Sequence, residues 1–459
     1  MLNCYTHQKN QNAISLLAFN RPQLNDWLVS QDQTIKNMVA SLGFVADVGQ
    51  TALLFDKEGS LTKVLVGMGD ENDLSVFGTM ARQLPEGVYV AENLSGTDSY
   101  HAYLSWGLGN YQFTAYKKSK PLLAKLYLPE SYAQYGYLKA ILDATYLVRD
   151  LINTPANDMM PSDLTEAVMN LAEKFGGKVE TTIGDDLLAA NYPTIHTVGR
   201  ASHHAPRLID FRWGNEAHPK VTLVGKGVCF DSGGLDLKTA SGMLGMKKDM
   251  GGAAHVIGLA YIIMSLGLPI RLRVLISAVE NAVSGNAYHP GDIIVTRKGL
   301  SVEVTNTDAE GRLILSDALC EASTEHPELL LDFATLTGAA RVGLGTDLGG
   351  FFTTDDDFAQ KMHEMSEREH DYLWRLPLHK PYRRDLDSKV ADIMNTVLTG
   401  YGGAITAALF LKEFVGEGIC WGHFDIMAAN VKNTSTGLEG GEAHTLRAVA
   451  RYLCERFPA

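Results

Sequence analysis

The sequence predicts an α/β fold with two domains: a small N-terminal α/β domain and a larger C-terminal domain with a mixed, mostly parallel sheet flanked by helices. Three observations support this prediction. With 459 residues, the chain is too long for a single hydrophobic core. From about residue 180 onward, short apolar runs typical of strands alternate with helical patterns, as in βαβ units. An amphipathic segment near residue 140 separates this region from a shorter α/β region.

The N-terminal domain is assigned to residues 1–135. Residues 63–69 have the pattern of a strand that ends in a glycine turn, and a helix over 74–84 and a strand over 87–91 follow. Gly67 and Gly69 resemble the start of a phosphate-binding loop. The third glycine of that fingerprint is absent, so an ordinary strand-to-helix turn is favoured.

Residues 136–160 are assigned to a connecting helix and the loop after it. Apolar residues line one face of a helix over 137–151, and Pro155 cannot continue that helix. A second helix is expected to start with Ser162 as its N-cap and to end at Gly176. The C-terminal domain is assigned to residues 161–459.

The C-terminal domain contains four clear candidate strands and one very apolar helix. The helix, 252–266, is apolar almost all round, so we expect it to be buried in the core. It contains His255 and, with its flanks, falls short of a typical membrane span. The strands are expected at 221–224, 272–279, 293–296 and 329–334.

The composition narrows the class of protein. A hydrophobic share of 46% and a charged share of 20% are ordinary for a globular enzyme. The net charge of -13 argues against a dedicated binder of nucleic acid or anionic membranes. The five cysteines are scattered and odd in number, and the first residues lack the pattern of a signal peptide. We therefore expect a cytoplasmic protein with reduced thiols.

One stretch, 305–312, carries two carboxylates and a guanidinium at alternate positions. Residues two apart share one face of an extended strand, and the alternation over 301–304 favours that conformation. Asp308, Glu310 and Arg312 are therefore expected on one ribbon, where they could hold a divalent cation beside an anion. A solvated loop with a surface ion pair is the alternative.

Two further loops carry charged residues at the expected ends of strands. Lys226 and Asp231 lie in the glycine-rich stretch 225–238, which follows a strand-like run. In open α/β sheets, ligands bind beyond the carboxyl ends of strands. Asp249 precedes the buried helix, where it would serve either as the N-cap or as a metal ligand.

The four carboxylates of Asp231, Asp249, Asp308 and Glu310 would repel one another if they lay together without a counter-charge. Two divalent cations about 3.5–4 Å apart would remove this repulsion and form a hydrolytic site. Lys226 could join such a site only as a neutral amine, and nearby dications would lower its pKa enough for that.

These stretches together resemble the leucyl (cytosol) aminopeptidase family. The resemblance is collinear from about residue 140 to 430 and is highly specific, whereas the N-terminal third matches only by position and α/β pattern. The matching segments are 149–157, 224–227, 230–234, 246–254, 306–313, 334–339, 374–378 and 402–408.

The resemblance implies a site with two metal ions. Lys226, Asp231, Asp249 and Glu310 would hold one ion, and Asp231, Asp308 and Glu310 the other. The family pattern implies zinc or manganese, with magnesium or cobalt as alternatives.

The resemblance also implies a metal-dependent aminopeptidase, in which a metal-bridging water or hydroxide attacks the scissile carbonyl. Lys238 would polarise that carbonyl. Arg312 would bind a bicarbonate that takes a proton from the bridging water. The substrates would be peptides with a free N-terminus, and the assembly a homohexamer.

The residues expected to line the pocket for the first side chain include two departures from the family pattern. Met246, Thr335 and Gly338 match family positions. Met427 replaces a small residue, and Asn430 replaces an apolar one. If both face the pocket, it is narrower and more polar than a leucine pocket, which would shift the preference for the first residue.

A third departure lies close to the predicted catalytic lysine. Asp236 occupies a position where the family pattern leads us to expect serine. An extra carboxylate there would damp the positive field of Lys238.

Two other classes of function remain as alternatives. A di-metal phosphoesterase would share the carboxylate-rich site but would not release amino acids from free peptides. A regulatory DNA-binding protein would show salt-sensitive binding to DNA, which the acidic balance disfavours.

Overall fold

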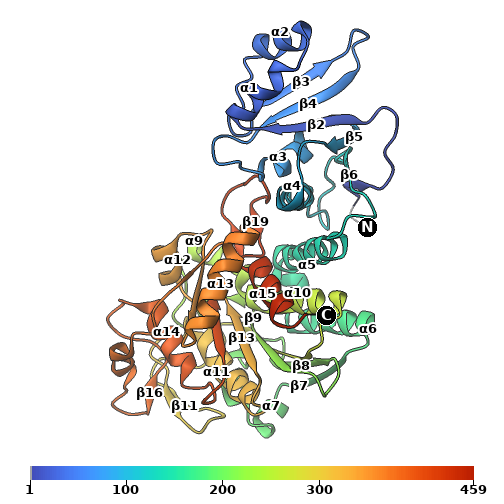
Figure 1. The fold of residues 1–459 in the computed structure, drawn as a ribbon. Helices are drawn as coiled ribbons and strands as arrows, with labels where there is room; N and C mark the ends of the chain where they lie inside the picture. The colour runs from blue at the N-terminus through green and yellow to red at the C-terminus, as the bar shows by residue number, and fades with distance from the viewer. Residues whose placement is uncertain (1–2, 459) are drawn as a thin grey trace. The chain divides into compact units, whose positions relative to one another are not determined.

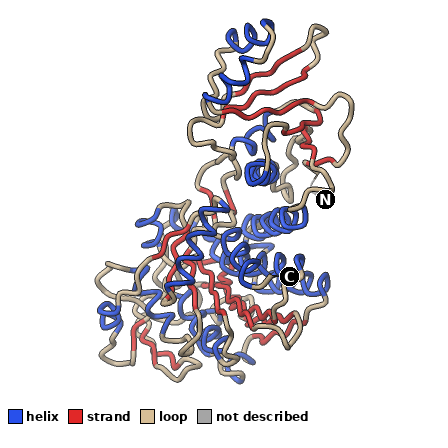
Figure 2. The backbone as a smooth tube through the Cα atoms, viewed as in Figure 1, coloured by secondary structure: helices blue, strands red, loops and turns tan. Residues whose placement is uncertain are grey.

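The computed structural model describes residues 3–458, which form two compact units (Figures 1 and 2). The first unit runs to Tyr146 and also includes Lys432–Glu439. The second contains Leu147–Val431 and the chain from Gly440 onward. The division falls inside helix α5 (Tyr135–Asn153). The domain boundaries placed at residues 135 and 160 stay a prediction.

The first unit is built on a six-stranded sheet in the order β1-β6-β5-β2-β4-β3. Neighbouring strands are parallel except β3, which pairs antiparallel with β4. The helix predicted over 74–84 corresponds to α3, and the strand predicted over 87–91 corresponds to β5. The strands are β1 (Tyr5–Thr6), β2 (Ile14–Phe19), β3 (Thr51–Phe55), β4 (Leu61–Gly67), β5 (Gly87–Ala91) and β6 (Ala124–Tyr127), and the helices are α1 (Arg21–Val29), α2 (Gln33–Ser41), α3 (Val76–Gln83) and α4 (Gly96–Gly109).

The second unit is built on an eight-stranded sheet in the order β15-β14-β17-β13-β9-β10-β8-β7. The four central strands β17, β13, β9 and β10 are mutually parallel, and antiparallel pairs flank them. The predicted mixed, mostly parallel sheet is confirmed. The strands are β7 (Lys178–Ile183), β8 (Arg207–Trp213), β9 (Lys220–Asp231), β10 (Arg271–Asn281), β13 (Leu329–Ala334), β14 (Gly349–Thr353), β15 (Leu373–Arg375) and β17 (Trp421–Asp425).

Small sheets and helices complete the second unit. A three-stranded sheet joins β11 (Ile293–Val295), β12 (Ser301–Glu303) and β16 (Ile393–Met394), and β18 (Ala429–Asn430) pairs with β19 (Gly440–Gly441). The helices are α6 (Pro161–Phe175), α7 (Asp186–Ala189), α8 (Pro193–Gly199), α9 (Ala240–Met243), α10 (Gly251–Leu266), α11 (Glu310–Ser323), α12 (Gly338–Leu344), α13 (Asp356–Glu369), α14 (Gly403–Lys412) and α15 (Leu446–Arg456), with 3₁₀ turns η1 (Ala156–Asp158), η2 (Met246–Met250) and η3 (Lys380–Leu386).

Helices α10 and α11 pack against opposite faces of strand β9 (Figure 1). A Cβ at Gly225 would lie 2.7 Å from Ala253 of α10, and a Cβ at Gly311 of α11 would lie 2.5 Å from Lys226. Successive strand residues point to opposite faces. The chain therefore places Lys226 on the α11 face, where the site is built.

The apolar helix α10 is buried along almost its whole length, as predicted. Gly267 adopts the left-handed conformation, with φ of 63°, and ends the helix. By length and composition alone, residues 246–266 could cross a membrane, and they are the one such stretch among the described residues. Most of this stretch is packed inside the protein core.

The start of helix α6 differs from the prediction. The helix begins at Pro161, and Ser162 lies within its first turn instead of capping it. Asp163 caps the N-terminus of the helix, because its carboxylate accepts a hydrogen bond of 2.8 Å from the Met160 amide. Proline at the first helical position favours this start. The helix ends at Gly176, as expected.

Candidate metal centre

The sequence pattern predicts an extended ribbon over residues 305–312. The structure differs, because these residues form a turn and the start of a helix. Strand β12 ends at Glu303, a turn follows, and helix α11 begins at Glu310. The side chain of Asn306 accepts a 2.8 Å hydrogen bond from the Asp308 amide and fixes that turn. The turn still brings the two carboxylates together: oxygens of Asp231, Asp308 and Glu310 lie within 4.8 Å of one another.

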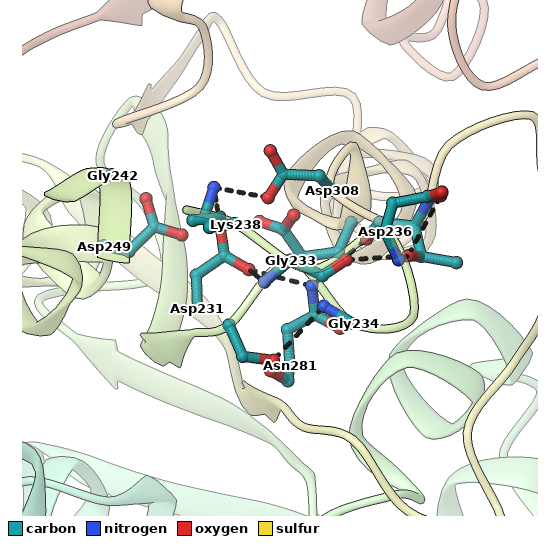
Figure 3. Close-up of polar contacts among 12 residues, drawn as sticks. Asp231, Gly233, Gly234, Asp236, Lys238, Gly242, Asp249, Asn281 and Asp308 are labelled. Atoms are coloured by element: carbon teal, nitrogen blue, oxygen red, sulfur yellow. Dashed lines mark hydrogen bonds and ion pairs between the residues drawn. The ribbon is translucent and has the colours of Figure 1, made fainter. Parts of the chain in front are cut away.

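Asp231 lies at the carboxyl end of β9, where neighbouring groups fix its orientation (Figure 3). Its Oδ1 accepts hydrogen bonds from the Gly233 amide (2.9 Å) and from Asn281 Nδ2 (2.8 Å). Its Oδ2 lies 2.8 Å from Lys238 Nζ, which also pairs with Asp308. Gly233 has a φ of 88°, which favours glycine at this sharp turn.

Lys226 lies between two further carboxylates. Its Nζ is 2.6 Å from Asp249 Oδ2 and 3.0 Å from Glu310 Oε1, and all three residues are buried. Asp249 Oδ1 accepts a 2.7 Å hydrogen bond from the hydroxyl of Thr335. The side chain of Asp249 therefore does not cap α10, and the structure removes that alternative to the metal-ligand role.

Burial and mutual repulsion shift the pKa values of these carboxyl groups. Burial, together with the charge of Asp231, raises the pKa of Glu310 to about 8 and that of Asp308 to about 6. Burial alone would lower the pKa of Lys226, but the charges of Asp249 and Glu310 raise it. Burial and the mutual repulsion of the carboxylates therefore disfavour the charged forms of Glu310 and Asp308.

This donor set fits divalent cations. Carboxylate oxygens converge from the end of β9, from the turn before α11 and from the start of α11, and Glu310 Oε2 is buried without a hydrogen-bond partner among the described residues. Oxygen-rich ligation suits divalent ions, and their charge would offset the repulsion that now raises the pKa values of the carboxyl groups.

Arg312 is buried in the first turn of α11 and has unused hydrogen-bonding capacity. Its Nη1 donates to the Asn395 carbonyl (2.6 Å), whereas Nε has no acceptor within residues 3–458. Burial lowers the pKa of Arg312 to about 10, so the guanidinium stays charged at neutral pH. A buried cation with a free N–H group is able to hold an anion.

Sequence reasoning missed the residues that hold this loop in place. The Asn395 side chain accepts from the Thr305 amide (2.8 Å) and donates to the Asn306 carbonyl (2.7 Å). Asn281 bridges Asp231 and the Thr307 carbonyl. These asparagines lie outside the motifs, and the sequence pattern gives no signal for their contacts.

Asp236 contacts the loop and not the lysine. Its Oδ2 accepts a 2.7 Å hydrogen bond from the Thr307 amide, and its own amide donates to Thr307 Oγ1 (2.8 Å). The carboxylate forms no ion pair with Lys238 in the described structure. Asp236 ties the 233–238 turn to Thr307, and its effect on the field of Lys238 stays a prediction.

The residues expected to line the pocket occupy different environments. Thr335 is hydrogen-bonded to Asp249, beside the carboxylates, and Gly338 is exposed at the start of α12. Met246 and Met427 are half-buried. Asn430 is buried and donates a 2.6 Å hydrogen bond to Glu442, so its amide belongs to a polar cluster. The pocket roles of these residues stay predictions.

Glu442 in that cluster makes an acid-sensitive contribution to stability. Burial would raise its pKa, but the paired Arg149, 2.8 Å away, lowers it to about 2. A depressed folded-state pKa stabilises the protein above the ordinary value of 4.5 and loses this contribution as pH falls toward 2. We expect Glu442→Gln to lower the melting temperature at pH 7. Below pH 4.5, the melting temperature of this variant should fall less steeply with decreasing pH than that of the wild type. Equal slopes for both proteins in thermal melts would contradict this expectation.

A cavity of about 1220 Å³ in the second unit lies apart from the carboxylates. Its lining includes Arg375, Lys380, Arg383 and Lys412, and none of the candidate metal ligands. The candidate metal ligands therefore lie outside the lining of this cavity, at the carboxyl end of β9, in η2 and near the start of α11.

Comparison with known proteins matches both units of the chain to one family. Residues 146–450 match the model of the cytosol aminopeptidase family catalytic domain, and residues 14–129 match that of the M17 aminopeptidase N-terminal domain. A probable cytosol aminopeptidase of Nocardia farcinica is 37% identical over 387 residues, which cover 80% of this chain and 76% of the relative.

Solved structures agree over nearly the whole chain. The cytosol aminopeptidase of Coxiella burnetii matches with a TM-score of 0.96 and 48% identity, covering 99% of this chain and 100% of that one. The bottromycin maturation enzyme BotP in complex with Mn matches with a TM-score of 0.88 and 31% identity, covering 97% and 99% of the two chains.

Proposed function

The chain belongs to the cytosol aminopeptidase family, a group of metal-dependent hydrolases that release N-terminal amino acids, and from this premise we propose how its residues divide the work. Lys226, Asp231, Asp249 and Glu310 would hold one divalent ion. Asp231, Asp308 and Glu310 would hold a second, so Asp231 and Glu310 would serve both sites. The convergence of these side chains is the observation that carries the proposal.

Bound divalent ions would supply an activated water and a Lewis acid at this site. The residues of the chain position the substrate and move charge. Lys238, half-buried beside Asp231 and Asp308, donates to the oxygen of the scissile carbonyl and stabilises the negative charge that develops there. In the unliganded cluster, burial would lower the pKa of Lys238, but the charges of Asp231 and Asp308 raise it, so the amine stays protonated.

Arg312 holds the anion that receives a proton during attack, and bicarbonate is the anion that we propose. The free Nε–H group of Arg312 supports this assignment. A planar oxyanion matches the fork of a guanidinium. A free substrate amine is required because it sits against the metal site, which makes the enzyme an exopeptidase. We further propose zinc or manganese as the native ions, a homohexameric assembly and a cytoplasmic location.

Metal removal tests the ligand set. Dialysis against a chelator should abolish release of amino acids from peptides with a free N-terminus, because the carboxylate cluster cannot activate water alone. Re-addition of zinc, manganese, magnesium or cobalt, one at a time, should restore activity to different extents, and elemental analysis should give two ions per chain. Activity that survives complete removal of metal would contradict the proposal. N-acetylated peptides serve as the matched control, since they lack the free amine.

A further inference from the structure

The cavity of about 1220 Å³ in the second unit is lined by more cations than carboxylates. All of its lining residues belong to that unit. The net charge of -13 would predict the opposite balance for a cavity in this chain. Clefts lined by one sign of charge concentrate ligands of the opposite sign. The lining contains two acidic residues, Glu413 and Glu417, and five basic ones, Lys298, Arg375, Lys380, Arg383 and Lys412.

The two arginines of the lining have carboxylate partners. Arg375 Nη2 lies 2.7 Å from Asp356 Oδ1. Arg383 Nε lies 2.5 Å from Glu413 Oε1, and its Nη1 lies 2.8 Å from Asp387 Oδ1. One of the two acidic lining residues is therefore already used by an arginine. The positive charge that is left in the cavity comes from the lysines.

None of the three lining lysines forms an ion pair within residues 3–458. Lys298 donates a hydrogen bond to the Glu413 carbonyl. Lys412 is half-buried in the last turn of α14, and Lys380 is exposed at the start of η3. Helix α14 and η3 pack against each other, which brings the two lysines to the same cavity. Only the Glu417 carboxylate remains to offset three ammonium groups, and an ammonium group is a compact charge that suits phosphate.

The rest of the lining is largely apolar. Its side chains include those of Leu376, Leu378, Leu409 and Ile419. Trp421 also contributes, and its position is fixed because its indole Nε1 donates a 2.7 Å hydrogen bond to the buried Asp332 carboxylate. A cavity of this size is much larger than one inorganic anion and has room for a ligand of nucleotide size. The cavity therefore suits a ligand with a negative group and an organic part.

We propose that this cavity binds a small organic phosphate, with its phosphate groups on Lys380 and Lys412 and its organic part against the apolar side chains. The cavity contains none of the candidate metal ligands. The inference therefore goes beyond the proposed peptidase function and does not depend on it. A bound phosphate would be held without a metal ion, by charge and by the apolar contacts.

Isothermal titration calorimetry on the metal-loaded full chain tests this proposal with ADP and glucose 6-phosphate. At least one of them should bind with a Kd below about 1 mM at low salt, and the affinity should fall as the ionic strength rises. Adenosine and glucose, which lack the phosphate, should bind at least about 10-fold more weakly. Affinity in metal-depleted protein should be the same, because the metal ligands lie outside the cavity. Pyrophosphate, an inorganic anion, shows whether charge alone is enough.

Lys380→Met and Lys412→Met should each weaken binding of the organic phosphate by about 3–10-fold. The double variant should weaken it by about 10–100-fold, and Lys412→Arg should retain most of the affinity because it keeps the charge. Lys389→Met is the matched control, since Lys389 is an exposed lysine of the same unit outside the lining, and its affinity should not change.

Three results would overturn the inference: no binding of either organic phosphate, binding that disappears when metal is removed, or unchanged binding in the double variant. Tighter binding of pyrophosphate than of both organic phosphates would also overturn it, because the apolar lining would then have no role. The wild-type titrations with and without metal decide the matter even where a variant fails to fold.

Discussion

Glu310→Gln should lower kcat/KM by about 10³-fold, because it removes a ligand shared by both proposed metal sites. Losing about 4 kcal/mol of transition-state stabilisation corresponds to this factor. The fold should survive the change. Without metal, burial and the charge of Asp231 raise the pKa of Glu310 and disfavour its charged form, so an uncharged glutamine of the same shape should cost the metal-free fold little. The metal-free melting temperatures should therefore agree, while the increase caused by added metal should disappear in the variant.

Glu364→Gln is the matched control for this prediction. Glu364 lies on the outer face of α13, where it pairs with Lys361 at 2.7 Å and accepts a 3.1 Å hydrogen bond from Gln360. This variant should keep full activity and the full stabilisation by metal. Unchanged activity in Glu310→Gln, measured in the same assay, would remove Glu310 from the site.

Lys238→Met should lower kcat by about 10²–10³-fold with little change in KM, because the amine acts on charge that appears only in the transition state. Metal binding should persist, since Lys238 is not proposed as a ligand. Metal binding should even tighten slightly in the variant, because in the wild type the Lys238 amine pairs with Asp231 and Asp308, two of the proposed ligands. Steady-state kinetics together with metal titration separate these effects.

Lys361→Met, a change at an exposed lysine on α13, provides the control. A Lys238→Met enzyme that loses metal along with activity would make Lys238 a structural part of the site. A rise in KM at constant kcat would make it a residue that binds substrate without acting on the transition state.

Local patterns were enough to locate several elements of both units. Strands β5 and β13 occur at the predicted residues, and β9 and β10 contain the predicted runs. The buried helix α10 follows from apolar residues on every face. The conformation of residues 305–312 was predicted wrongly, because period-two alternation over 301–304 was extended into a segment where Asn306 forms a turn and α11 begins.

The sequence by itself determined the α/β class, the parallel core of the second unit and the motifs that point to a dinuclear hydrolase, because these depend on periodicity and on residue types close together in the chain. Only the tertiary structure decided which groups meet. Arg312 finds the Asn395 carbonyl 83 positions away, and Asn281 finds Asp231 50 positions away. Contacts between distant segments depend on how strands and helices pack, and no local pattern encodes that packing.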